Sequence, residues 1–378
     1  MEINVDKLAQ EAINQINKKI KNLKHLNIII VGKTGVGKST LINSVFREKL
    51  ADTGIGKPVT EEVRAITKPE FPLTIYDTPG FDLGSHKQED LLKEITTLIQ
   101  QGVSSHDINK MIHCMWYCIN TSSSRVEQEE IDWIRNFAKE NKITEVPIIV
   151  ILTQAVPKKD AKAMKDYIEA QNLDIARVVP LLAIDKDYDE EFVYQAYGCD
   201  DLIEVMMDTL DKDLLETLQN VQIASLESKK KYSEGIIAAA VAAAFGEGFA
   251  PIPFSDAALL VPTQVGMIAG ITAVFGIDIS KSFLTAFVSS TIGGAGATVL
   301  GKTIVANIFK LIPGVGTGIG GAISGATAGL ITTALGMAYI KIMEMVYNGE
   351  MTKEQLIGED GKDKMKRIFK EELKKKRK

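Results

Sequence analysis

The feature that most constrains this chain is the stretch from Leu26 to Thr40, which reads LNIIIVGKTGVGKST. Ile28 to Val31 are apolar and β-branched, which predicts a short strand buried on both faces. Gly32 to Ser39 then match the pattern G-x-x-x-x-G-K-S, and apolar residues at helical spacing follow. A strand, a glycine-rich loop and a helix in this order predict a phosphate-binding P-loop within a doubly wound, mostly parallel α/β sheet.

The residue types in this loop suit phosphate chemistry. Glycines let the backbone turn its N–H groups toward phosphate oxygens, and the following helix adds its N-terminal dipole. We expect Lys38 to place its charge on the β- and γ-phosphates, as a catalytic residue, and the Ser39 hydroxyl to hold Mg²⁺. The alternative, a glycine-rich turn that binds nothing, is disfavoured by the flanking strand and helix. The predicted phosphate-binding residues are Gly32, Lys33, Thr34, Gly35, Val36, Gly37, Lys38, Ser39 and Thr40.

A second motif follows about forty residues later. Leu73 to Tyr76 predict another buried strand, and Asp77-Thr78-Pro79-Gly80 come directly after it. An aspartate at the carboxyl end of a strand beside a P-loop can reach Mg²⁺ through water. Gly80 can offer its backbone N–H to the γ-phosphate, which makes it a candidate catalytic position.

The segment between these motifs, residues 52–60, contains glycine and proline and predicts a loop. A threonine here can turn its hydroxyl to Mg²⁺ and its N–H to a γ-phosphate, so that the order of the loop depends on the nucleotide. Thr60 is the candidate for both the metal and the catalytic role. Thr53 is the second choice, and Thr67 lies too deep in the next expected strand.

The motifs GKTGVGKST and YDTPGF resemble the Era, septin and dynamin-related branch of P-loop GTPases, over residues 26–210. The resemblance implies a Ras-like G domain that binds GTP, GDP and Mg²⁺, with Thr60 in switch I and Asp77 to Gly80 at the start of switch II. Homodimers across the nucleotide face are common in such relatives. Phe81 stands where Ras-like proteins carry the glutamine that orients the attacking water, which implies slow hydrolysis.

The base-reading motif departs from the family pattern. Such proteins place [N/T]-K-x-D after the strand predicted at residues 148–152, and the aspartate accepts two hydrogen bonds from guanine. Here Val156 occupies the aspartate position, which should cost about 2–4 kcal/mol of guanine selectivity. Asp160 is the nearest other carboxylate. Guanine is expected by resemblance, and an ATP-selective protein or a nucleotide-binding scaffold with little hydrolysis are the alternatives. The predicted base-contacting residues are Thr153, Gln154, Leu182 and Ala183.

The composition changes abruptly at Gly235. Residues 257–277, 282–301 and 311–340 contain no charged side chain, and each segment is long enough to cross about 30 Å of hydrocarbon. Frequent glycine, and prolines at 262 and 313, argue against spanning helices. A soluble bundle with a very apolar core and a membrane-associating domain both remain open. Residues 235–346 resemble the YcjF-type bacterial domain of unknown function.

Three further segments complete the expected organisation. Residues 1–25 predict an amphipathic helix that docks on a neighbouring helix, with a dimer or membrane contact as the alternative. Residues 201–231 predict one long amphipathic helix, and a connecting helix at 211–234 is expected between the G domain and the hydrophobic domain at 235–348. The basic tail at 349–378 suits either anionic lipid or a frayed, solvated end.

The net charge and the cysteine content limit the possible binding partners and the cellular compartment of the protein. A net charge of −5 and a pI near 5.6 argue against nucleic acid as the main partner. The three cysteines match no zinc pattern and predict buried thiols in a reducing compartment. We therefore expect a cytoplasmic protein that is peripheral or integral at the inner face of the plasma membrane. His113 is expected to be a core histidine with satisfied hydrogen bonds.

Overall fold

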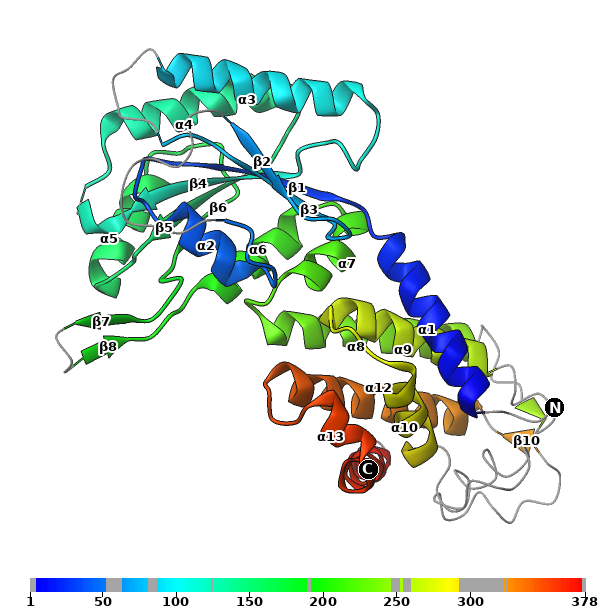
Figure 1. Cartoon of the computed structure of the whole chain (residues 1–378). Helices are drawn as coiled ribbons and strands as arrows, with labels where there is room; N and C mark the ends of the chain where they lie inside the picture. The colour runs from blue at the N-terminus through cyan, green and yellow to red at the C-terminus, as the bar shows by residue number, and fades with distance from the viewer. Residues whose placement is uncertain are drawn as a thin grey trace. The chain divides into compact units, whose positions relative to one another are not determined.

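The computed structural model describes residues 5–51, 63–80, 87–123, 125–188, 192–245, 252–253, 260–291, 322–323 and 325–375. The chain divides into two compact units (Figure 1). One unit comprises residues 23–228 and is called the sheet unit. The other combines residues 1–22 with residues 229–378 and is called the helical unit.

The sheet unit is built on a six-stranded sheet in the order β2-β3-β1-β4-β5-β6. Five strands are parallel, and β2 pairs antiparallel with β3 at one edge. The bounds are β1 Leu26–Val31, β2 Arg64–Thr67, β3 Leu73–Asp77, β4 Cys114–Asn120, β5 Ile148–Thr153 and β6 Arg177–Pro180. This mostly parallel sheet confirms the predicted fold class for the first part of the chain.

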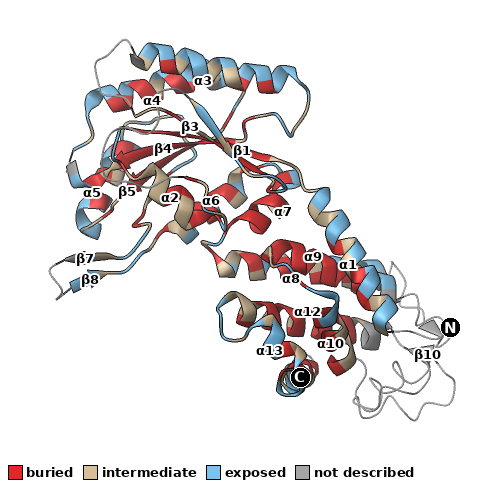
Figure 2. Cartoon of the chain, viewed as in Figure 1, coloured by how far each residue is buried: buried red, intermediate tan, exposed pale blue. Residues whose placement is uncertain are grey.

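Helices cover both faces of the sheet, because the central strands are apolar on both sides (Figure 2). One face packs against α2 Lys38–Val45, α6 Cys199–Thr209 and α7 Lys212–Val221. The other packs against α3 Lys87–Ser104, α4 Gln128–Glu140 and α5 Lys158–Glu169. Two short 3₁₀ helices, η1 Thr121–Ser123 and η2 Asn141–Ile143, and a hairpin of β7 Lys186–Tyr188 and β8 Phe192–Tyr194 complete the unit.

The single long helix predicted over residues 201–231, and with it the connecting helix at 211–234, is wrong. The structure has α6, α7 and α8 Leu226–Phe245 instead. Asp211 begins α7 by accepting a hydrogen bond from the Asp213 backbone N–H. Beyond α7, Ile223 N–H donates to Val45 O over 2.7 Å, while Arg47 N–H donates to Val221 O over 2.9 Å. This extended pairing with the end of α2 interrupts the helical pattern.

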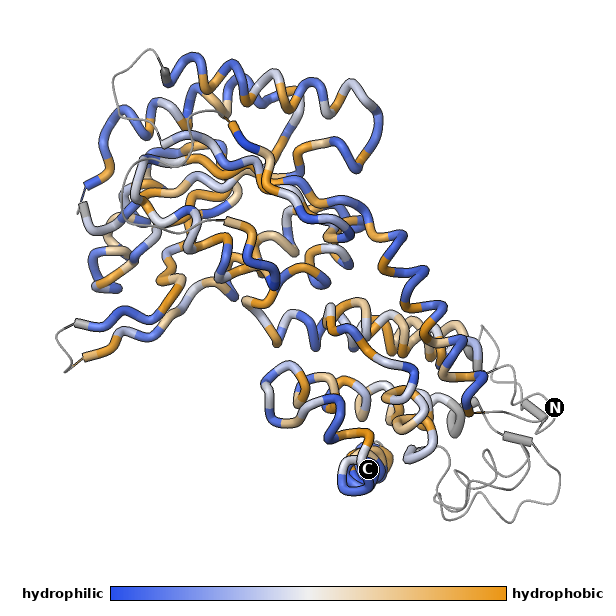
Figure 3. Tube along the Cα trace, in the orientation of Figure 1, coloured by the Kyte–Doolittle hydropathy of each residue, from blue (hydrophilic) through white to orange (hydrophobic). Residues whose placement is uncertain are grey.

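The helical unit contains α1 Val5–Lys21, most of α8, α9 Leu260–Phe275, α10 Lys281–Thr291, α12 Gly325–Tyr347, α13 Lys353–Ile357 and α14 Glu359–Lys375, with a two-strand pair of β9 Ile252–Pro253 and β10 Ala322–Ile323. Hydrophilic and hydrophobic residues alternate along α1 (Figure 3). Its buried residues Ala9, Ala12 and Ile16 face α9 and α10, so the predicted docking on a neighbouring helix is confirmed.

The C-terminal tail is not a frayed end. Residues 359–375 form α14, whose buried Met365, Phe369 and Leu373 pack toward α10, α12 and α13. Glu372 is 3% exposed and pairs with Lys341 of α12 at 2.6 Å and with Lys375 at 3.1 Å. The expectation of a solvated terminus is therefore wrong as far as Lys375, because the apolar stripe of the tail is buried against other helices.

Among the described residues, one helical segment, Gly329–Tyr347, is apolar and long enough to cross a membrane, and 67% of its most apolar window is buried within the protein. Two charged residues of this segment pair with neighbouring helices: Lys341 with Glu372, and Glu344 with Lys230 of α8 at 3.3 Å. Residues 292–321, which include half of the predicted segment 282–301 and about a third of the predicted segment 311–340, lie outside the described residues. Apart from the β9–β10 pair, the described part of this domain is helical, as expected.

Candidate functional site

The loop between β1 and α2 has the backbone that its glycines allow. Gly37 caps α2 in the left-handed conformation with φ of 96°, which side chains disfavour. Gly32 lies against β4, where an added Cβ would come within 2.5 Å of the Cys118 carbonyl oxygen. The loop therefore passes directly over the end of the central strands, and a side chain at either position would strain it.

Lys38 begins α2 and folds back over this loop. Its ammonium donates to Gly32 O at 2.8 Å and to Lys33 O at 3.4 Å. Burial lowers the pKa of Lys38, and the nearby Asp77 carboxylate partly offsets that effect. A cation held by carbonyl oxygens at the rim of a glycine-rich loop can exchange those acceptors for phosphate oxygens, which satisfy it better.

Asp77 lies at the carboxyl end of β3, beside the loop. It pairs in register with Ile30 of β1, and the next residue, Thr78, donates both its N–H and its hydroxyl to Ile30 O at 3.2 and 2.9 Å. These bonds fix the Asp77 carboxylate, which is 8% exposed, near the start of α2. Ser39 is the second residue of α2.

This donor set suits magnesium. A serine hydroxyl and one carboxylate are hard oxygen ligands, and Mg²⁺ usually combines one or two of these with phosphate oxygens and water. Within the described ranges there is no cluster of three or more His, Cys, Asp or Glu side chains that could hold a metal without such help. The residues present therefore fit a magnesium ion that arrives with a phosphate ligand.

Gly80 contacts the P-loop directly. A Cβ added to Gly80 would lie 2.1 Å from Thr34 Oγ1 and 2.5 Å from Thr34 N. The backbone at the end of the Asp77–Gly80 motif therefore lies against Thr34, on the loop that carries Lys38. Lys38, Asp77 and Gly80 converge at one edge of the sheet, as the sequence predicted. Thr60 and Phe81 lie outside the described residues.

The segment after β5 is also joined to the P-loop. Thr153 donates its hydroxyl to Val36 O at 2.6 Å. The Gln154 amide nitrogen would be 4.0 Å from a Cβ on Gly37, so its side chain lies over the loop where the family pattern has lysine. Leu182 is 3% exposed and exchanges both backbone hydrogen bonds with Tyr197 at 3.0 Å, and Ala183 follows it at the edge of the same core.

Residues 26–186 match the AIG1 family, and residues 211–378 match a domain of unknown function, DUF697. The first part of the chain is an AIG1-family P-loop GTPase domain. The predicted resemblance of residues 235–346 to a domain of unknown function is also confirmed, because the DUF697 match covers this segment. The family assignment agrees with the convergence of Lys38, Asp77 and Gly80 described above.

The GTPase domain has curated relatives of several kinds. Septin-2 of Rattus norvegicus is 26% identical over 209 residues, which cover 48% of this chain and 56% of the septin. The chloroplastic GTPase ERA-like protein of Oryza sativa subsp. japonica is 29% identical over 163 residues, covering 41% of this chain and 35% of that protein. The chain thus spans about half the length, or less, of these relatives.

Solved structures similar to this chain include a point variant of Era of Aquifex aeolicus bound to GDP.AlF4-, with a TM-score of 0.34, 16% identity, and coverage of 61% of this chain and 74% of that chain. Toc33 of Arabidopsis thaliana with Mg²⁺ and GMPPNP has a TM-score of 0.31, 20% identity, and coverage of 57% and 95%. Another Era structure contains MgGDPNP and a segment of 16S ribosomal RNA.

Two features near the segment after β5 were not predicted. Tyr197, which follows the β7–β8 hairpin, donates its hydroxyl to Ala155 O. The Lys158 ammonium lies 4.1 Å from the centre of the Tyr197 ring. Asp160 is exposed in the first turn of α5, and Val156 is half-buried. The contacts of Tyr197 join segments about forty residues apart, so no local pattern reveals them.

A charged cluster links the P-loop of the GTPase domain to α4. Lys33 pairs with Glu127 at 3.1 Å and with Glu130 at 3.7 Å. Glu130 is 3% exposed, and burial raises its pKa while Lys33 lowers it. Glu127 and Glu130 also form the capping box of α4. The spacing of two acids at the start of a helix could have indicated the cap, but not its contact with Lys33.

The remaining candidates in the GTPase domain are structural. Cys114 and Cys118 are buried thiols, as expected, and burial raises the pKa of Cys118 to about 12. His113 accepts from Asn27 N at 2.9 Å and bonds Ile108 O at 2.8 Å through its other ring nitrogen. Burial lowers its pKa to about 4. These contacts confirm His113 as a core histidine.

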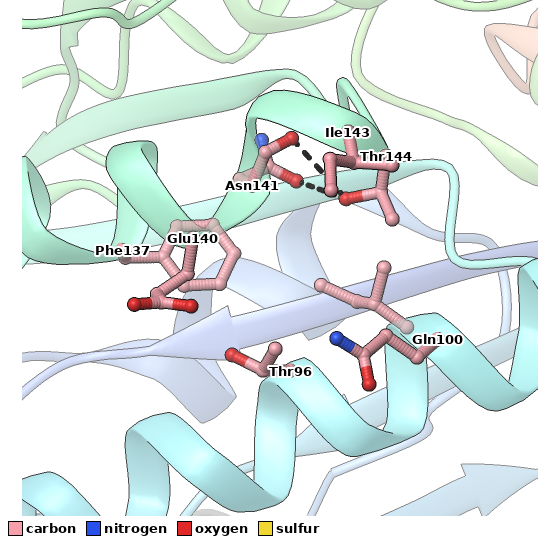
Figure 4. A pocket seen from close by; sticks show the side chains of 8 residues that line it. Thr96, Gln100, Phe137, Glu140, Asn141, Ile143 and Thr144 are labelled. Atoms are coloured by element: carbon pink, nitrogen blue, oxygen red, sulfur yellow. Dashed lines mark hydrogen bonds between the residues drawn. The ribbon is translucent and has the colours of Figure 1, made fainter.

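A cavity of about 60 Å³ lies between α3 and the end of α4 (Figure 4). Thr96 and Gln100 line it from α3, and Phe137, Asn141 and Thr144 line it from the opposite wall. The Thr144 hydroxyl donates to Asn141 Oδ1 at 2.7 Å. Pockets for drug-sized ligands and cofactors occupy about 300–1,000 Å³, so this cavity is too small to be the nucleotide site.

Proposed function

We propose that the protein binds GTP with magnesium, hydrolyses it slowly, and uses the bound nucleotide to control the helical domain. The observation that carries this proposal is the convergence of the Lys38 ammonium, the Asp77 carboxylate and the Gly80 backbone on one glycine-rich loop. A lysine that donates to the loop's own carbonyls at 2.8 Å is placed to transfer those bonds to a triphosphate.

Each site residue has a proposed role. The backbone of Gly32 to Gly37, together with Thr40, holds the phosphates, while Lys38 stabilises negative charge on the β- and γ-phosphates. Ser39, Asp77 and Thr60 would hold Mg²⁺, which neutralises charge that develops on the phosphate oxygens. The Gly80 N–H donates to the γ-phosphate. Phe81 has no atom that orients water, so we expect turnover to be slow.

The identity of the base is the second part of the proposal. Gln154 covers Gly37, and Thr153 is bonded to Val36, so both hold the base-reading segment against the loop. Leu182 and Ala183 would then line the base. Guanine is proposed on the family assignment, with Asp160 as a candidate reader. Val156 favours a second candidate function, an ATP-selective protein of the same loop class.

Competition between GTP and ATP tests both functions. We expect calorimetry with magnesium to show GTP binding to the full chain, and Lys38→Ala to abolish it. Val156→Asp should raise the ratio of GTP to ATP affinity about 30-fold or more, and Asp160→Asn should lower it if Asp160 reads the base. Tighter binding of ATP than of GTP by the wild type would replace the guanine proposal with its alternative.

The same proposal covers the helical domain and the location of the protein. We propose that residues 235–348, with the basic tail, meet the inner face of the plasma membrane from the cytoplasm in a nucleotide-dependent way, and that homodimers form across the nucleotide face. The acidic net charge of the chain supports partners other than nucleic acid.

Flotation with anionic liposomes, compared among nucleotide-free, GDP and non-hydrolysable GTP states, tests the switch. Equal partitioning in all three states would contradict it.

A nucleotide-binding scaffold with little hydrolysis is favoured by Phe81 and Val156. Single-turnover phosphate release separates this scaffold from a slow GTPase. Cleavage that is measurable in the wild type and abolished in Lys38→Ala supports the enzyme. Phosphate release at the same rate in both proteins would indicate that the P-loop, with Lys38, does not catalyse the reaction.

A further inference from the structure

Among the P-loop hydroxyls of Thr34, Ser39 and Thr40, the hydroxyl of Thr34 is the one that lies against Gly80. Thr34 is exposed, and its Oγ1 lies so near Gly80 that a Cβ on that glycine would be 2.1 Å away. Within the part of the chain that the structure describes, this hydroxyl has no hydrogen-bond partner. By contrast, the hydroxyls of Thr78, Thr121 and Thr153 all donate to backbone carbonyls.

The position of this hydroxyl bears on hydrolysis. The γ-phosphate end of the cradle is bounded by the loop that carries Lys38 and by Gly80, and Thr34 lies where these two segments touch. An attacking water must be held in line with the bond that breaks, which requires a hydrogen-bonding group near the γ-phosphate. The residue after Gly80 is phenylalanine, which offers none. A threonine hydroxyl can donate one hydrogen bond and accept two.

We infer that Thr34 positions the attacking water in this domain and so replaces the polar residue missing after Gly80. The water oxygen forms a bond to the γ-phosphorus while the bond from that phosphorus to the β,γ-bridging oxygen breaks. The electron pair of the broken bond stays on GDP, and a water proton passes to a γ-phosphate oxygen, which yields GDP and inorganic phosphate. Thr34 accepts a hydrogen bond from the water and is unchanged.

This inference rests on the proposed GTPase function and names a residue within the same site. A competing explanation is steric: the Thr34 side chain could serve only as a spacer that supports the Gly80 backbone. The two explanations differ in which atom matters, since positioning needs the hydroxyl and spacing needs the volume. Thr34→Val keeps the volume and removes the hydroxyl, whereas Thr34→Ser keeps the hydroxyl and removes the methyl group.

Single-turnover GTP hydrolysis by the full chain tests the inference. We expect Thr34→Val to lower the rate constant about 10- to 100-fold, the range that loss of precise orientation produces, with GTP and GDP affinities changed less than about threefold. Thr34→Ser should stay within about threefold of the wild type. The wild type and Thr34→Ser should also bind GDP more tightly when aluminium fluoride is added, and Thr34→Val should not.

The outcomes separate the inference from the function on which it rests. If the wild type cleaves GTP and Thr34→Val cleaves it equally fast, the inference is wrong while the GTPase proposal stands. If Thr34→Ser loses activity and Thr34→Val keeps it, Thr34 acts as a spacer. If the wild type binds GTP without cleaving it, the proposed enzyme and this role of Thr34 both fail.

Discussion

Charged groups serve different purposes in the two units of the molecule. In the sheet unit, Asp77 is the last residue of β3, and Lys38 is the first residue of α2, which follows β1 and the glycine-rich loop. In the helical unit, two of the described ion pairs join neighbouring helices: Glu372 of α14 meets Lys341 of α12, and Glu344 of α12 meets Lys230 of α8. One arrangement places charged groups beside the P-loop, and the other uses charged groups to pair helices.

The comparison teaches where to look for chemistry in this chain. A largely desolvated cation that can exchange carbonyl oxygens for phosphate gains energy when a ligand arrives. A buried carboxylate already paired with two lysines gains nothing from a ligand, and breaking the pair exposes a desolvated charge. Substitutions in the two units should therefore separate into effects on binding and effects on stability.

The largest expected effect is the loss of Lys38. Lys38→Ala should weaken nucleotide binding at least about 100-fold, about 3 kcal/mol, because the β- and γ-phosphates lose their cation. It should leave the unfolding transition nearly unchanged, since burial already disfavours this charge in the folded state. Fluorescence titration with a labelled nucleotide and thermal unfolding measure the two effects. Lys49→Ala, at an exposed position near the end of α2, is the control. A large loss of stability in Lys38→Ala would contradict the separation between effects on binding and effects on stability.

The second effect is a dependence on pH that belongs to the sheet unit. Burial lowers the pKa of His113 from about 6.5 to about 4 in the folded state. The unfolded chain therefore binds a proton at His113 first as the pH falls, so the contribution of His113 to stability is constant above about 6.5 and decreases between 6.5 and 4. The total loss is about 3 kcal/mol, because each pKa unit corresponds to about 1.36 kcal/mol.

Both tryptophans, Trp116 and Trp133, lie in the sheet unit, so their fluorescence reports its unfolding. His113→Asn keeps an acceptor for the Asn27 N–H and cannot titrate in this range. Its urea midpoint should change less between pH 6.5 and 4 than that of the wild type. Burial also lowers the pKa of His25, which is present in both proteins, and the His25 charge further lowers the pKa of His113. Identical pH profiles would contradict the role of His113.

Sequence reasoning found the groups on the strand ends because local order predicts them. A strand, a glycine loop and a lysine are adjacent in sequence, and Asp77 comes at the carboxyl end of its strand. The helix break after Val221 could not be predicted this way, because it depends on pairing between Ile223 and Val45, which are far apart in the chain. The same holds for Lys33 and Glu127, which are joined only by the fold.

The third effect concerns the helical unit. Glu372→Gln should lower its stability by about 1–2 kcal/mol, less than for a fully buried pair, because Lys341 and Lys375 are 36% and 62% exposed. Circular dichroism in the far ultraviolet should show the loss, while tryptophan fluorescence and nucleotide affinity stay unchanged. Glu371→Gln, an exposed substitution on the same helix, is the matched control. A shift in the fluorescence transition would mean that the two units do not unfold independently.

The smallest effect tests whether the cluster beside the P-loop belongs with binding or with packing. Glu127 is 53% exposed, so Glu127→Gln should change stability by less than about 0.5 kcal/mol. Glu130 is nearly buried, and Glu130→Gln removes a carboxylate that burial already disfavours, so it too should cost little. If the cluster restrains Lys33, both variants should alter the nucleotide dissociation rate in stopped-flow measurements, whereas Glu129→Gln should not. Equal dissociation rates in the three variants would indicate that this cluster is a packing contact beside the P-loop, like the ion pairs that join helices in the helical unit.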